Sequence, residues 1–534
     1  MIQSDDGNAA GQAELLDFLG SADSYGLSAA TVERIETHAS IVFLVGDHAY
    51  KIKKAVKYRF LDFSTLERRR AACLNELRVN ARTAPGLYLR VAPILRAPGG
   101  GFRFGGEGEA ATAPDGDVAE WVLVMRRFDQ EALLDRMAEE GRLPLDMMTP
   151  LAESIADFHL SADRFLAQDA PARSLAGVLA DNASVLAAHP DLFPAEDAVA
   201  FAESALAALA FLVPLLKVRA RDGYVRHCHG DLHLRNIVAI DGKPVLFDAI
   251  EFDDRLATID VLYDLAFLLM DIGRRGLRGH ANRVLNAYLD REGSTANLLG
   301  LAALPLYLST RAAIRAKVEL LRARSVPPAE AAGVLAEAGA YFDLARSFLA
   351  PPRPGLIVIG GLSGSGKSGL SRAIAVQLGC FPGAIHVRSD VERKRMFGVV
   401  DAGVRLPKTA YTSEVSDVVY AVCRKRAALA LEAGHSVVLD GVHARPEERR
   451  AVRQLAESLG VSFTGIWLDA PPAILKSRVS ARSGDVSDAT AEVVEEQLGY
   501  DLGPLDFVRV DASKSLEQVI ESCLAVIGGT EPGR

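Results

Sequence analysis

The chain has 534 residues, of which 49% are hydrophobic and 24% are charged, and its formal net charge is −9. This length is too great for one hydrophobic core and predicts two or three domains. The acidic balance argues against a surface built mainly for nucleic acid, although a local basic groove stays compatible with it.

Cysteine usage and the apolar runs bear on the compartment. The five cysteines are scattered without a Cys-x-x-Cys pair, which fits reduced thiols and predicts no zinc site. The start of the chain is acidic and lacks the apolar core of a signal peptide. The longest apolar run, Ala205 to Leu216, contains Pro214 and is too short to cross a bilayer. We therefore expect a soluble, cytoplasmic protein with no membrane contact.

The N-terminal part of the chain predicts a small strand-rich lobe. Residues 1–36 are typical of two short helices, and 41–45 with 49–53 predict a hairpin around Gly46-Asp47. Lys51 and Lys53 fall on one face of the second strand, since side chains alternate. They could reach phosphates or could simply be solvated. Residues 64–84 predict a helix carrying Glu67 and Glu76. Residues 87–95 and 121–125 predict further strands, and the Gly-rich stretch 97–117 between them predicts an exposed loop.

The stretch His229 to Asn236 carries the first set of chemical groups. Asp241-Gly242 predicts a tight turn, so Ile240 pairs with Lys243 and, counting back, Asn236 pairs with Phe247. Asn236 and Asp248 then lie together at the open end of the hairpin, with Asp231 on the loop before it. An acid that orients an acceptor, with an amide and a second acid as magnesium ligands, is what a kinase requires.

Other acids follow this hairpin at short intervals. Glu251 is close enough to orient metal or substrate. Asp260 and Asp264 are four residues apart and share a helix face, where we expect capping or structural roles. Ala-rich helices then continue to about residue 350, and the proline-rich stretch 351–355 predicts a linker and a domain boundary.

A second set of groups begins directly after this linker. The run 356–359 predicts a buried strand, and the Gly361–Ser368 stretch that follows it is a complete GxxxxGK[ST] motif leading into a helix. Backbone N–H groups of such a loop surround a phosphate at the positive end of a helix. We expect the phosphate-binding residues to be Gly361, Ser363, Gly364, Ser365, Gly366, Lys367 and Ser368, with Ser368 also holding magnesium.

The residues after this loop alternate strands with helices, which predicts a parallel sheet with helices on both faces. The strands are expected at 385–388, 436–440, 463–468 and 507–510. Ligands bind at the carboxyl ends of such strands. Asp390 there could accept the proton of a substrate hydroxyl, and Asp440 could orient magnesium. Arg478 and Arg482, four apart on one helix, could stabilise transition-state charge, or could form a solvated face.

The first half resembles the aminoglycoside phosphotransferase family, relatives of the protein kinases, at His229-Gly230-Asp231 through Asn236 and at Asp248. The resemblance implies that Asp231 is catalytic and that Asn236 and Asp248 bind magnesium. It also implies that Lys51 contacts phosphates and pairs with Glu76, with Lys53 and Glu67 as competitors. The turn at 37–40 has no glycine-rich loop. Aminoglycoside specificity does not follow, because the superfamily also covers choline, homoserine and sugar kinases.

The last 180 or so residues look like small P-loop kinases such as gluconate kinase or the kinase domain of polynucleotide kinase. The segment from Arg388 to Lys394 is similar to the one that carries the base and a substrate-binding arginine in the latter. The order of the two halves resembles a bacterial family of predicted bifunctional proteins, which brings no substrate with it.

The predicted fold is an α+β protein-kinase-like two-lobed domain over 1–350, with a small lobe at about 37–127 and a helical lobe at about 128–350, followed by an α/β P-loop NTPase domain with a parallel sheet over 356–534. The leading hypothesis is a kinase with two sites for ATP and Mg²⁺, each phosphorylating a hydroxyl of a small molecule. A regulatory ATP-binding protein with one silent domain is an alternative. A 5′-hydroxyl nucleic-acid kinase in the second half is another. The oligomeric state does not follow from the sequence.

Overall fold

The computed structural model describes residues 6–27, 31–37, 39–58, 61–106, 109, 117–399, 403–481 and 487–529. The chain forms two compact units. Unit 1 comprises Met1–Ser154, Ser161–Phe165 and Val225–Asp264, and unit 2 comprises Ile155–Leu160, Leu166–Tyr224 and Leu265–Arg534. Each unit is described by itself.

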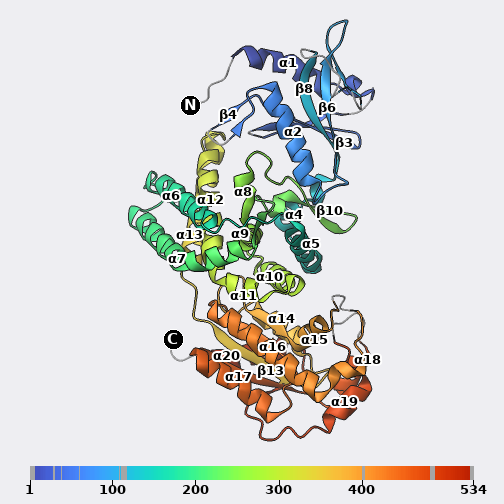
Figure 1. The fold of residues 1–534 in the computed structure, drawn as a ribbon, viewed down its shortest axis with the longest axis vertical. Helices are drawn as coiled ribbons and strands as arrows, with labels where there is room; N and C mark the ends of the chain where they lie inside the picture. The colour runs from blue at the N-terminus through green and yellow to red at the C-terminus, as the bar shows by residue number, and fades with distance from the viewer. Residues whose placement is uncertain are drawn as a thin grey trace. The chain divides into compact units, whose positions relative to one another are not determined.

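Unit 1 is built on a six-stranded sheet with the order β1-β2-β3-β8-β6-β7, in which every pairing is antiparallel. The strands are β1 (Glu33–Glu36), β2 (Ser40–Val45), β3 (His48–Lys53), β6 (Tyr88–Arg96), β7 (Phe102–Phe104) and β8 (Val118–Arg126). The predicted hairpin of β2 and β3 is present. Its second strand, β3, is labelled in Figure 1 together with β6 and β8. Two strands of this sheet were not expected from the sequence. β1 replaces part of a predicted helical region, and β7 lies in the predicted loop over 97–117.

Helices cover both faces of this sheet because the strand side chains alternate. Leu15 and Leu19 of α1 (Asp6–Gly20) pack on the face that carries Phe43 and Val45 of β2. Leu44, between those two residues, points to the other face, where Leu77 of α2 (Leu66–Asn80) joins the same hydrophobic cluster. Arg69 of α2 forms a buried ion pair with Glu120 of β8, at 2.8 Å between Nε and Oε2. This pair fixes α2 on the sheet.

The rest of unit 1 consists of short helices and short strands. These are η1 (Ala22–Tyr25), β4 (Lys57–Tyr58), β5 (Leu61–Asp62), η2 (Gln130–Ala132), α4 (Leu134–Glu139), η3 (Leu145–Met147), β9 (Val225–His227), η4 (Leu234–Asn236), β10 (Ile237–Ile240), β11 (Lys243–Leu246), α8 (Asp254–Ala257) and β12 (Thr258–Asp260). Two helices, α5 (Met148–Ser161) and α9 (Val261–Arg274), have residues in both units. β9 pairs with β12, and β10 pairs with β11.

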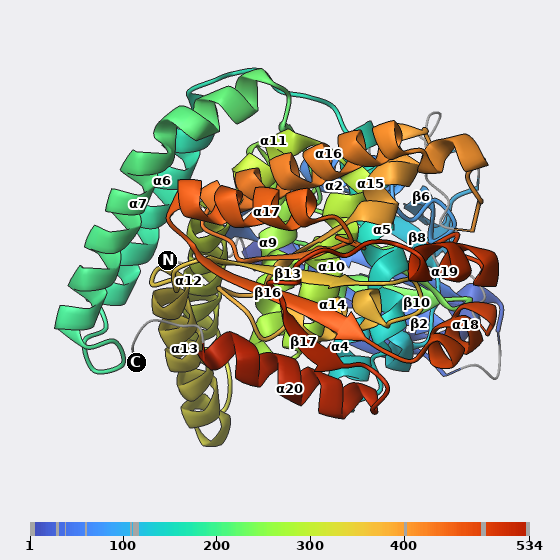
Figure 2. The same cartoon turned by 90° about the horizontal axis from the view of Figure 1, so that it is seen from below.

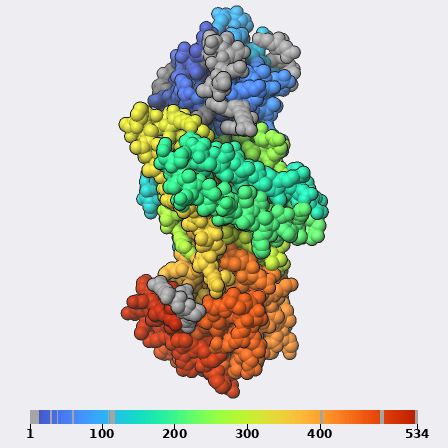
Figure 3. Space-filling model, turned by 90° about the vertical axis from the view of Figure 1, so that its left-hand side faces the viewer, coloured from blue at the N-terminus to red at the C-terminus, as the bar shows by residue number. Residues whose placement is uncertain are grey.

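Unit 2 contains a helical part that precedes the linker. Its helices are α6 (Ala170–Ala187), α7 (Ala195–Arg221), α10 (Arg278–Glu292), α11 (Thr295–Gly300), η5 (Leu301–Ala303), α12 (Leu304–Arg322) and α13 (Pro328–Phe348). Two segments have the length and hydropathy of a membrane span, Ala195–Arg221 and Thr295–Arg322. In the second, 78% of the most apolar window is buried in the fold, as expected of a core helix. Figure 3 shows α6 and α7 in green on the surface facing the viewer. Phe211 of α7 is 83% exposed.

The second part of unit 2 is a five-stranded sheet in the order β14-β15-β13-β16-β17, with every pairing parallel. The α/β fold with a parallel sheet predicted from the sequence is confirmed. The strands are β13 (Gly355–Gly361), β14 (Ile385–Arg388), β15 (Val437–Asp440), β16 (Ser462–Asp469) and β17 (Val508–Asp511).

Helices flank both faces of this sheet (Figure 2). They are α14 (Lys367–Ala375), α15 (Ser389–Met396), η6 (Lys408–Tyr411), α16 (Ser413–Glu432), α17 (Pro446–Leu459), α18 (Pro472–Ser480), α19 (Ala491–Leu498) and α20 (Leu516–Gly529). Ile374 of α14 and Cys523 of α20 pack against Ile359 of the central strand in one hydrophobic cluster. Because all five strands run parallel, their carboxyl ends share one edge, where ligands bind in folds of this kind.

Candidate active sites

The first site begins with two lysines on β3. Lys51 Nζ lies 2.7 Å from Glu76 Oε1 and 2.7 Å from Asp248 Oδ1. Lys53 Nζ lies 2.6 Å from Glu76 Oε2 and also pairs with Glu251. Neither lysine is solvated, since Lys53 is 2% exposed and the Lys51 side chain is 13% exposed. Glu76 therefore serves both lysines, whereas the competitor Glu67 is exposed in the first turn of α2.

The charges of this cluster shift each other's pKa values. Burial alone would raise the pKa of Glu76, but the charges of Lys51 and Lys53 outweigh it and hold this pKa at about 2. The pKa of Lys51 is raised although burial opposes this, because Asp248 and Glu76 stabilise the ammonium. Burial raises the pKa of Glu251, while Lys53 opposes the rise. Lys51 is thus held as a cation, and one of its two partners, Asp248, has a side chain that is 41% exposed.

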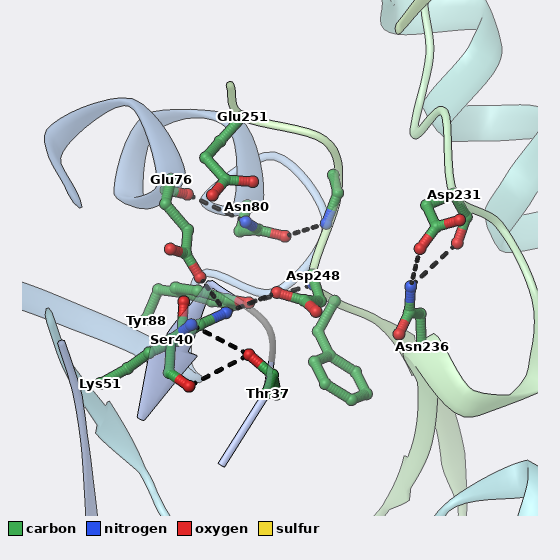
Figure 4. Close-up of polar contacts among 12 residues, drawn as sticks. Thr37, Ser40, Lys51, Glu76, Asn80, Tyr88, Asp231, Asn236, Asp248 and Glu251 are labelled. Carbon is green, nitrogen blue, oxygen red and sulfur yellow. Dashed lines mark hydrogen bonds and ion pairs between the residues drawn. The ribbon is translucent and has the colours of Figure 1, made fainter. Parts of the chain in front are cut away.

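A network of hydrogen bonds anchors the segment that carries Asp248. The Asp248 N–H donates to the Tyr88 hydroxyl at 3.0 Å, and the Ala249 N–H donates to Asn80 Oδ1 at 2.9 Å. Asn75 donates to the backbone carbonyl of Glu251. Asp248 has a φ of +59°, a left-handed conformation that costs about 1–3 kcal/mol outside glycine. The surrounding contacts sustain this strain and aim the carboxylate at Lys51 (Figure 4).

The loop before the hairpin is held from two sides. Asp264 Oδ2 accepts from the His229 N–H at 3.1 Å and Asp264 Oδ1 from the Gly230 N–H at 2.9 Å, which is the structural role expected of Asp264. Asp260 is the last residue of β12, so the predicted helix face shared with Asp264 is wrong, but it caps α9 by accepting from the Leu262 N–H, which is a capping role as expected. Burial lowers the pKa of His229, so the neutral ring bonds through Nε2 to the Phe247 carbonyl at 2.9 Å. His229 ties this loop to the segment that leads to Asp248.

Gly230 sits where a side chain would not fit. Its φ is +83°, and a Cβ at this position would lie 2.9 Å from Ile250 Cδ1. The close approach lets the loop turn directly beneath the segment that follows Asp248. The glycine of the His229-Gly230-Asp231 motif is therefore required by backbone conformation and by space.

The predicted hairpin register is confirmed. Ile240 pairs with Lys243, and the Phe247 N–H donates to the Asn236 carbonyl at 3.0 Å. The Asn236 side-chain amide donates to Asp231 Oδ2 and to the Asp231 carbonyl, both at 3.0 Å. In Figure 4, Asp248 lies between the Lys51–Glu76 pair and the Asp231–Asn236 pair. The side chain of Asp231 is 41% exposed and also contacts His233 Nε2 at 3.3 Å.

The turn between β1 and β2 lies at the same end of the sheet as the two lysines. Ser40 pairs with Lys53 across the strands. Thr37 Oγ1 accepts from the Ser40 N–H at 3.0 Å and donates to the Ser40 carbonyl at 3.1 Å. A side-chain-stabilised turn therefore connects β1 and β2, and His38 within it lies outside the described residues.

The second site is the loop between β13 and α14. Gly364 and Gly366 have φ values of +84° and +91°, and a Cβ on Gly364 would lie 2.4 Å from the Leu475 carbonyl oxygen. The Ser363 N–H donates to Gln497 Oε1 at 2.7 Å, and Lys367 Nζ donates to the Leu362 carbonyl at 3.0 Å. The loop therefore has the cradle shape in which backbone N–H groups meet a phosphate. Gln497 is a supporting residue that the sequence did not indicate.

Asp440 ends β15 at the edge next to this loop, and Asp390 follows the end of the neighbouring strand β14 by two residues. Asp440 pairs with Ile359 and with Arg388 in the sheet register. Burial would raise the pKa of Asp440, but hydrogen bonding and charge from His386, with smaller effects of Lys367 and Ser368, lower it. His386 Nε2 lies 3.5 Å from Asp440 Oδ2. Asp440 is thus an ionised carboxylate beside Ser368, which fits a pair of oxygen ligands for Mg²⁺.

Asp390 lies in the first turn of α15 and has different electrostatics. Burial raises its pKa, and Asp440 raises it further, whereas Ser487, Lys367 and Arg393 lower it. A carboxylate with a raised pKa is a better proton acceptor. Arg393, three residues later, packs over the Tyr411 ring at 4.9 Å and donates to the Ser416 hydroxyl at 3.3 Å.

His443 and Asp488, two residues near this edge, were not indicated by the sequence. His443 is 1% exposed, has a φ of +49°, and stacks on Tyr420 with ring centroids 4.9 Å apart. Within the described part of the chain neither ring nitrogen of His443 has a hydrogen-bond partner, and burial lowers its pKa to about 3. Lys394 Nζ lies 3.4 Å from Asp488 Oδ1, and the Tyr411 hydroxyl donates to Asp488 Oδ2 at 2.7 Å.

The arginines expected to close over this site have separate outcomes. Arg478 lies in α18, and its guanidinium donates to the Ala512 carbonyl at 2.9 Å. Arg482 lies outside the described residues, and α18 ends at Ser480. A shared face of the two arginines therefore stays a prediction.

Two protein families match separate parts of the chain. Residues 61–301 match the Phosphotransferase enzyme family, and residues 356–500 match an AAA domain family. Among solved structures, a choline/ethanolamine kinase family protein from Mesorhizobium loti is 17% identical, with 64% of this chain and 99% of that chain covered and a TM-score of 0.37. A gluconokinase from Sinorhizobium meliloti 1021 is 24% identical, covering 33% of this chain and 94% of its own, with a TM-score of 0.25.

The class of protein follows from the fold, the two sites and the family matches. The chain is a phosphotransferase, with a kinase-like domain of the Phosphotransferase enzyme family followed by a P-loop kinase domain. An uncharacterized protein of Mycobacterium tuberculosis H37Rv is 32% identical over 471 residues, which cover 86% of this chain and 88% of that protein. The chain belongs to the same family as this mycobacterial protein.

Proposed function

We propose that the protein is an ATP-dependent kinase with two nucleotide sites, each transferring the γ-phosphoryl group to a hydroxyl of a small molecule. The observation that carries this proposal is the presence of two separate sets of phosphate-handling groups. One is Lys51, Glu76 and Asp248 with Asp231 and Asn236. The other is the Gly361–Ser368 loop with Asp390 and Asp440.

In the first site, Lys51 is the cation that would hold the ATP phosphates, because Glu76 and Asp248 keep it charged. Asp248 and Asn236 offer carboxylate and amide oxygens of the kind that Mg²⁺ binds, and Mg²⁺ when bound would neutralise phosphate charge. Asp231 accepts the proton of the acceptor hydroxyl while the hydroxyl oxygen forms a bond to the γ-phosphorus. The bond between the γ-phosphorus and the β,γ-bridging oxygen breaks, and ADP leaves.

In the second site, the loop N–H groups and Lys367 would hold the phosphates, while Ser368 and Asp440 supply oxygens for Mg²⁺. Asp390 accepts the proton of the second acceptor hydroxyl, a role supported by its raised pKa. The bonds formed and broken are the same as in the first site. In both sites the side chains act by positioning and by stabilising charge.

We propose further that the protein works in the cytoplasm on small molecules. The five cysteines are all buried and free of disulfides, in keeping with a reducing compartment. The net charge of −9 disfavours a nucleic-acid acceptor. Labelling of a metabolite extract, described below, identifies each acceptor.

Calorimetry with ATP and Mg²⁺ tests the two nucleotide sites. The wild-type chain should bind two equivalents of ATP, and Lys51→Met and Lys367→Ala should each bind one. The double variant should bind none. Two binding events in Lys367→Ala would contradict the assignment of the P-loop site.

Incubation with labelled ATP and a metabolite extract tests phosphoryl transfer. Asp231→Asn should remove one labelled product and Asp390→Asn another, while nucleotide binding is kept in both. If wild-type protein labels nothing, a regulatory ATP-binding protein replaces this proposal. Labelling of a 5′-hydroxyl oligonucleotide, abolished by Asp390→Asn, would instead identify the second site as a nucleic-acid kinase.

A further inference from the structure

One face of α10 is bonded to the P-loop part of unit 2 along its whole length. Arg278, Asn282, Asn286 and Asp290 are spaced four residues apart and so lie on one face of the helix. Each of them makes a polar contact with a residue between 376 and 395. This face therefore follows the chain from the end of α14, along β14, to α15.

The contacts begin at the loop between α14 and β14. The Arg278 guanidinium donates to the Val376 carbonyl at 2.6 Å and to the Gly379 carbonyl at 3.0 Å. Asn282, which is 3% exposed, donates to the Ala384 carbonyl at 3.1 Å. These bonds satisfy backbone carbonyls that no strand or helix uses, because this stretch leads into an edge strand.

Asn286 substitutes for a neighbouring strand at the free edge of β14. Its Oδ1 accepts from the His386 N–H at 2.7 Å, and its Nδ2 donates to the Ala384 carbonyl at 3.2 Å. A residue of a parallel strand makes this same pair of bonds, to the carbonyl of one residue and the N–H two residues later. The side-chain amide thus extends the ladder by one peptide unit and covers an otherwise open edge.

Asp290 accepts hydrogen bonds from arginines at both ends of α15. Its Oδ2 accepts from the Arg388 guanidinium at 2.6 Å, immediately before the helix. Its backbone carbonyl accepts from Arg395 in the last turn at 2.8 Å. Glu392, 2% exposed, pairs with Arg395 from within α15. Arg388 precedes Asp390 by only two residues, so its orientation fixes the start of the turn that carries Asp390.

Arg426 of α16 makes a second set of contacts that link α15 to the end of α10. The Arg426 guanidinium lies 2.9 Å from Glu392 Oε1 and donates to the Gly293 carbonyl at 2.8 Å, just beyond the end of α10. Elsewhere in unit 2, His435 Nε2 contacts the Leu301 carbonyl at 3.1 Å, and burial lowers the pKa of His435 to about 4, so its ring is neutral at neutral pH. α15 is therefore enclosed by residues that precede the linker as well as residues that follow it.

We propose that α10 is a positioning element of the P-loop kinase site, and that Asp290 sets the orientation of Asp390 by acting through Arg388. This proposal rests on the proposed function, which assigns Asp390 as the proton acceptor of the second site. The working unit of the P-loop kinase then begins at α10, before the proline-rich linker, and includes a helix that belongs to the first domain by sequence.

The geometry favours positioning over a surface ion pair of little effect. The side chains of Arg388 and Asp290 are only 20% and 26% exposed, so their attraction is weakly screened. Both ends of α15 converge on Asp290, which restricts rotation of the helix. A displacement of about 1 Å of a group that aligns reactants can cost on the order of 100-fold in rate.

The test uses the full chain with the first site silenced by Lys51→Met. In this background Asp290→Asn, Arg388→Gln and the double variant are compared. The matched control is Asp157→Asn, which removes an acid from a more exposed pair with Arg291, the neighbour of Asp290 on α10. The readouts are the affinity for a fluorescent ATP analogue with Mg²⁺ and the slow turnover of ATP in which water replaces the acceptor.

We expect Asp290→Asn to lower turnover about 10- to 100-fold while nucleotide affinity changes less than twofold. The double variant should lose no more than the larger single loss, because both residues act through one contact. Asp290→Glu should recover part of the rate, and Asp157→Asn should match its parent. Unchanged turnover in Asp290→Asn, additive losses, or an equal loss of affinity would each overturn the positioning role.

The Lys367→Ala variant in the same background separates the two proposals. If it loses nucleotide binding while Asp290→Asn keeps full turnover, only the positioning role is wrong. If Lys367→Ala keeps both binding and turnover, the proposed function of the second site is wrong, and the positioning role falls with it.

Discussion

The side-chain amide of Asn236 donates to Asp231 Oδ2 at 3.0 Å, and so joins a proposed magnesium ligand to the proposed proton acceptor of the same site. The same amide nitrogen, Asn236 Nδ2, also donates to the Asp231 backbone carbonyl. Both bonds use the amide nitrogen, so the amide oxygen of Asn236 would be the atom that binds the proposed magnesium ion. Asn236 therefore bonds the proposed proton acceptor and is itself a proposed magnesium ligand.

Asn236→Ala should lower transfer at the first site about 10- to 100-fold, because it frees the Asp231 carboxylate and removes a ligand. The measurement is labelled product formed in the metabolite extract by protein whose second site is silenced by Lys367→Ala. The matched control is Asp241→Asn at the tip of the same hairpin, where φ is +50° and asparagine is tolerated. Equal rates for Asn236→Ala and Asp241→Asn would contradict this role.

Glu76 should also matter for stability. It is fully buried, and its two carboxylate oxygens neutralise Lys51 and Lys53. Glu76→Gln leaves two buried ammonium groups with less compensation, which should cost about 3–5 kcal/mol of unfolding free energy. Urea unfolding followed by circular dichroism measures this. Glu67→Gln, in the exposed first turn of the same helix, should stay within about 0.5 kcal/mol of wild type. A loss of that small size for Glu76→Gln would show that the cluster does not depend on its charge.

The pH dependence of the free energy of unfolding in the acid range should change with the same substitution. The pKa of Glu76 falls from an ordinary 4.5 to about 2 in the folded protein. A lowered folded pKa contributes stability above the unfolded value, and this is lost as pH falls from about 4.5 towards 2. Glu251 acts in the opposite direction, because burial raises its pKa. The difference between the wild-type and Glu76→Gln curves should therefore shrink across this window. A difference independent of pH would exclude Glu76 as its source.

Local signals explain the parts of the fold that the sequence predicted correctly. Asp241-Gly242 sets a two-residue turn, and with it the register that pairs Asn236 with Phe247. The Gly361–Ser368 loop depends on glycine conformations and on its flanking strand and helix. In both cases the determining residues are neighbours in the chain.

Features that depend on distant residues could not be foreseen in this way. β1 is exposed at all four residues and lacks the alternation that marks a half-buried strand. Gln497 bonds to Ser363 from 134 positions away. Asn286 and Asp290 look like ordinary polar residues on a helix, and only the packed structure brings them to β14 and α15. The choice of Glu76 over Glu67 as the partner of the β3 lysines likewise required the position of α2 on the sheet.

The P-loop backbone offers a direct test of the second site through a single methyl group. Gly364→Ala should abolish nucleotide binding there, because its φ is +84° and its Cβ would lie 2.4 Å from the Leu475 carbonyl oxygen. The loop would have to move from the shape in which its N–H groups converge on a phosphate.

Gly369→Ala is the matched control, since Gly369 lies in α14 with nothing within 4 Å of the added Cβ. It should bind ATP normally and gain up to about 1 kcal/mol of stability from helix propensity. Calorimetry in the Lys51→Met background then reports one binding event for Gly369→Ala and none for Gly364→Ala. Wild-type affinity in Gly364→Ala would mean that the loop conformation is not what binds the nucleotide.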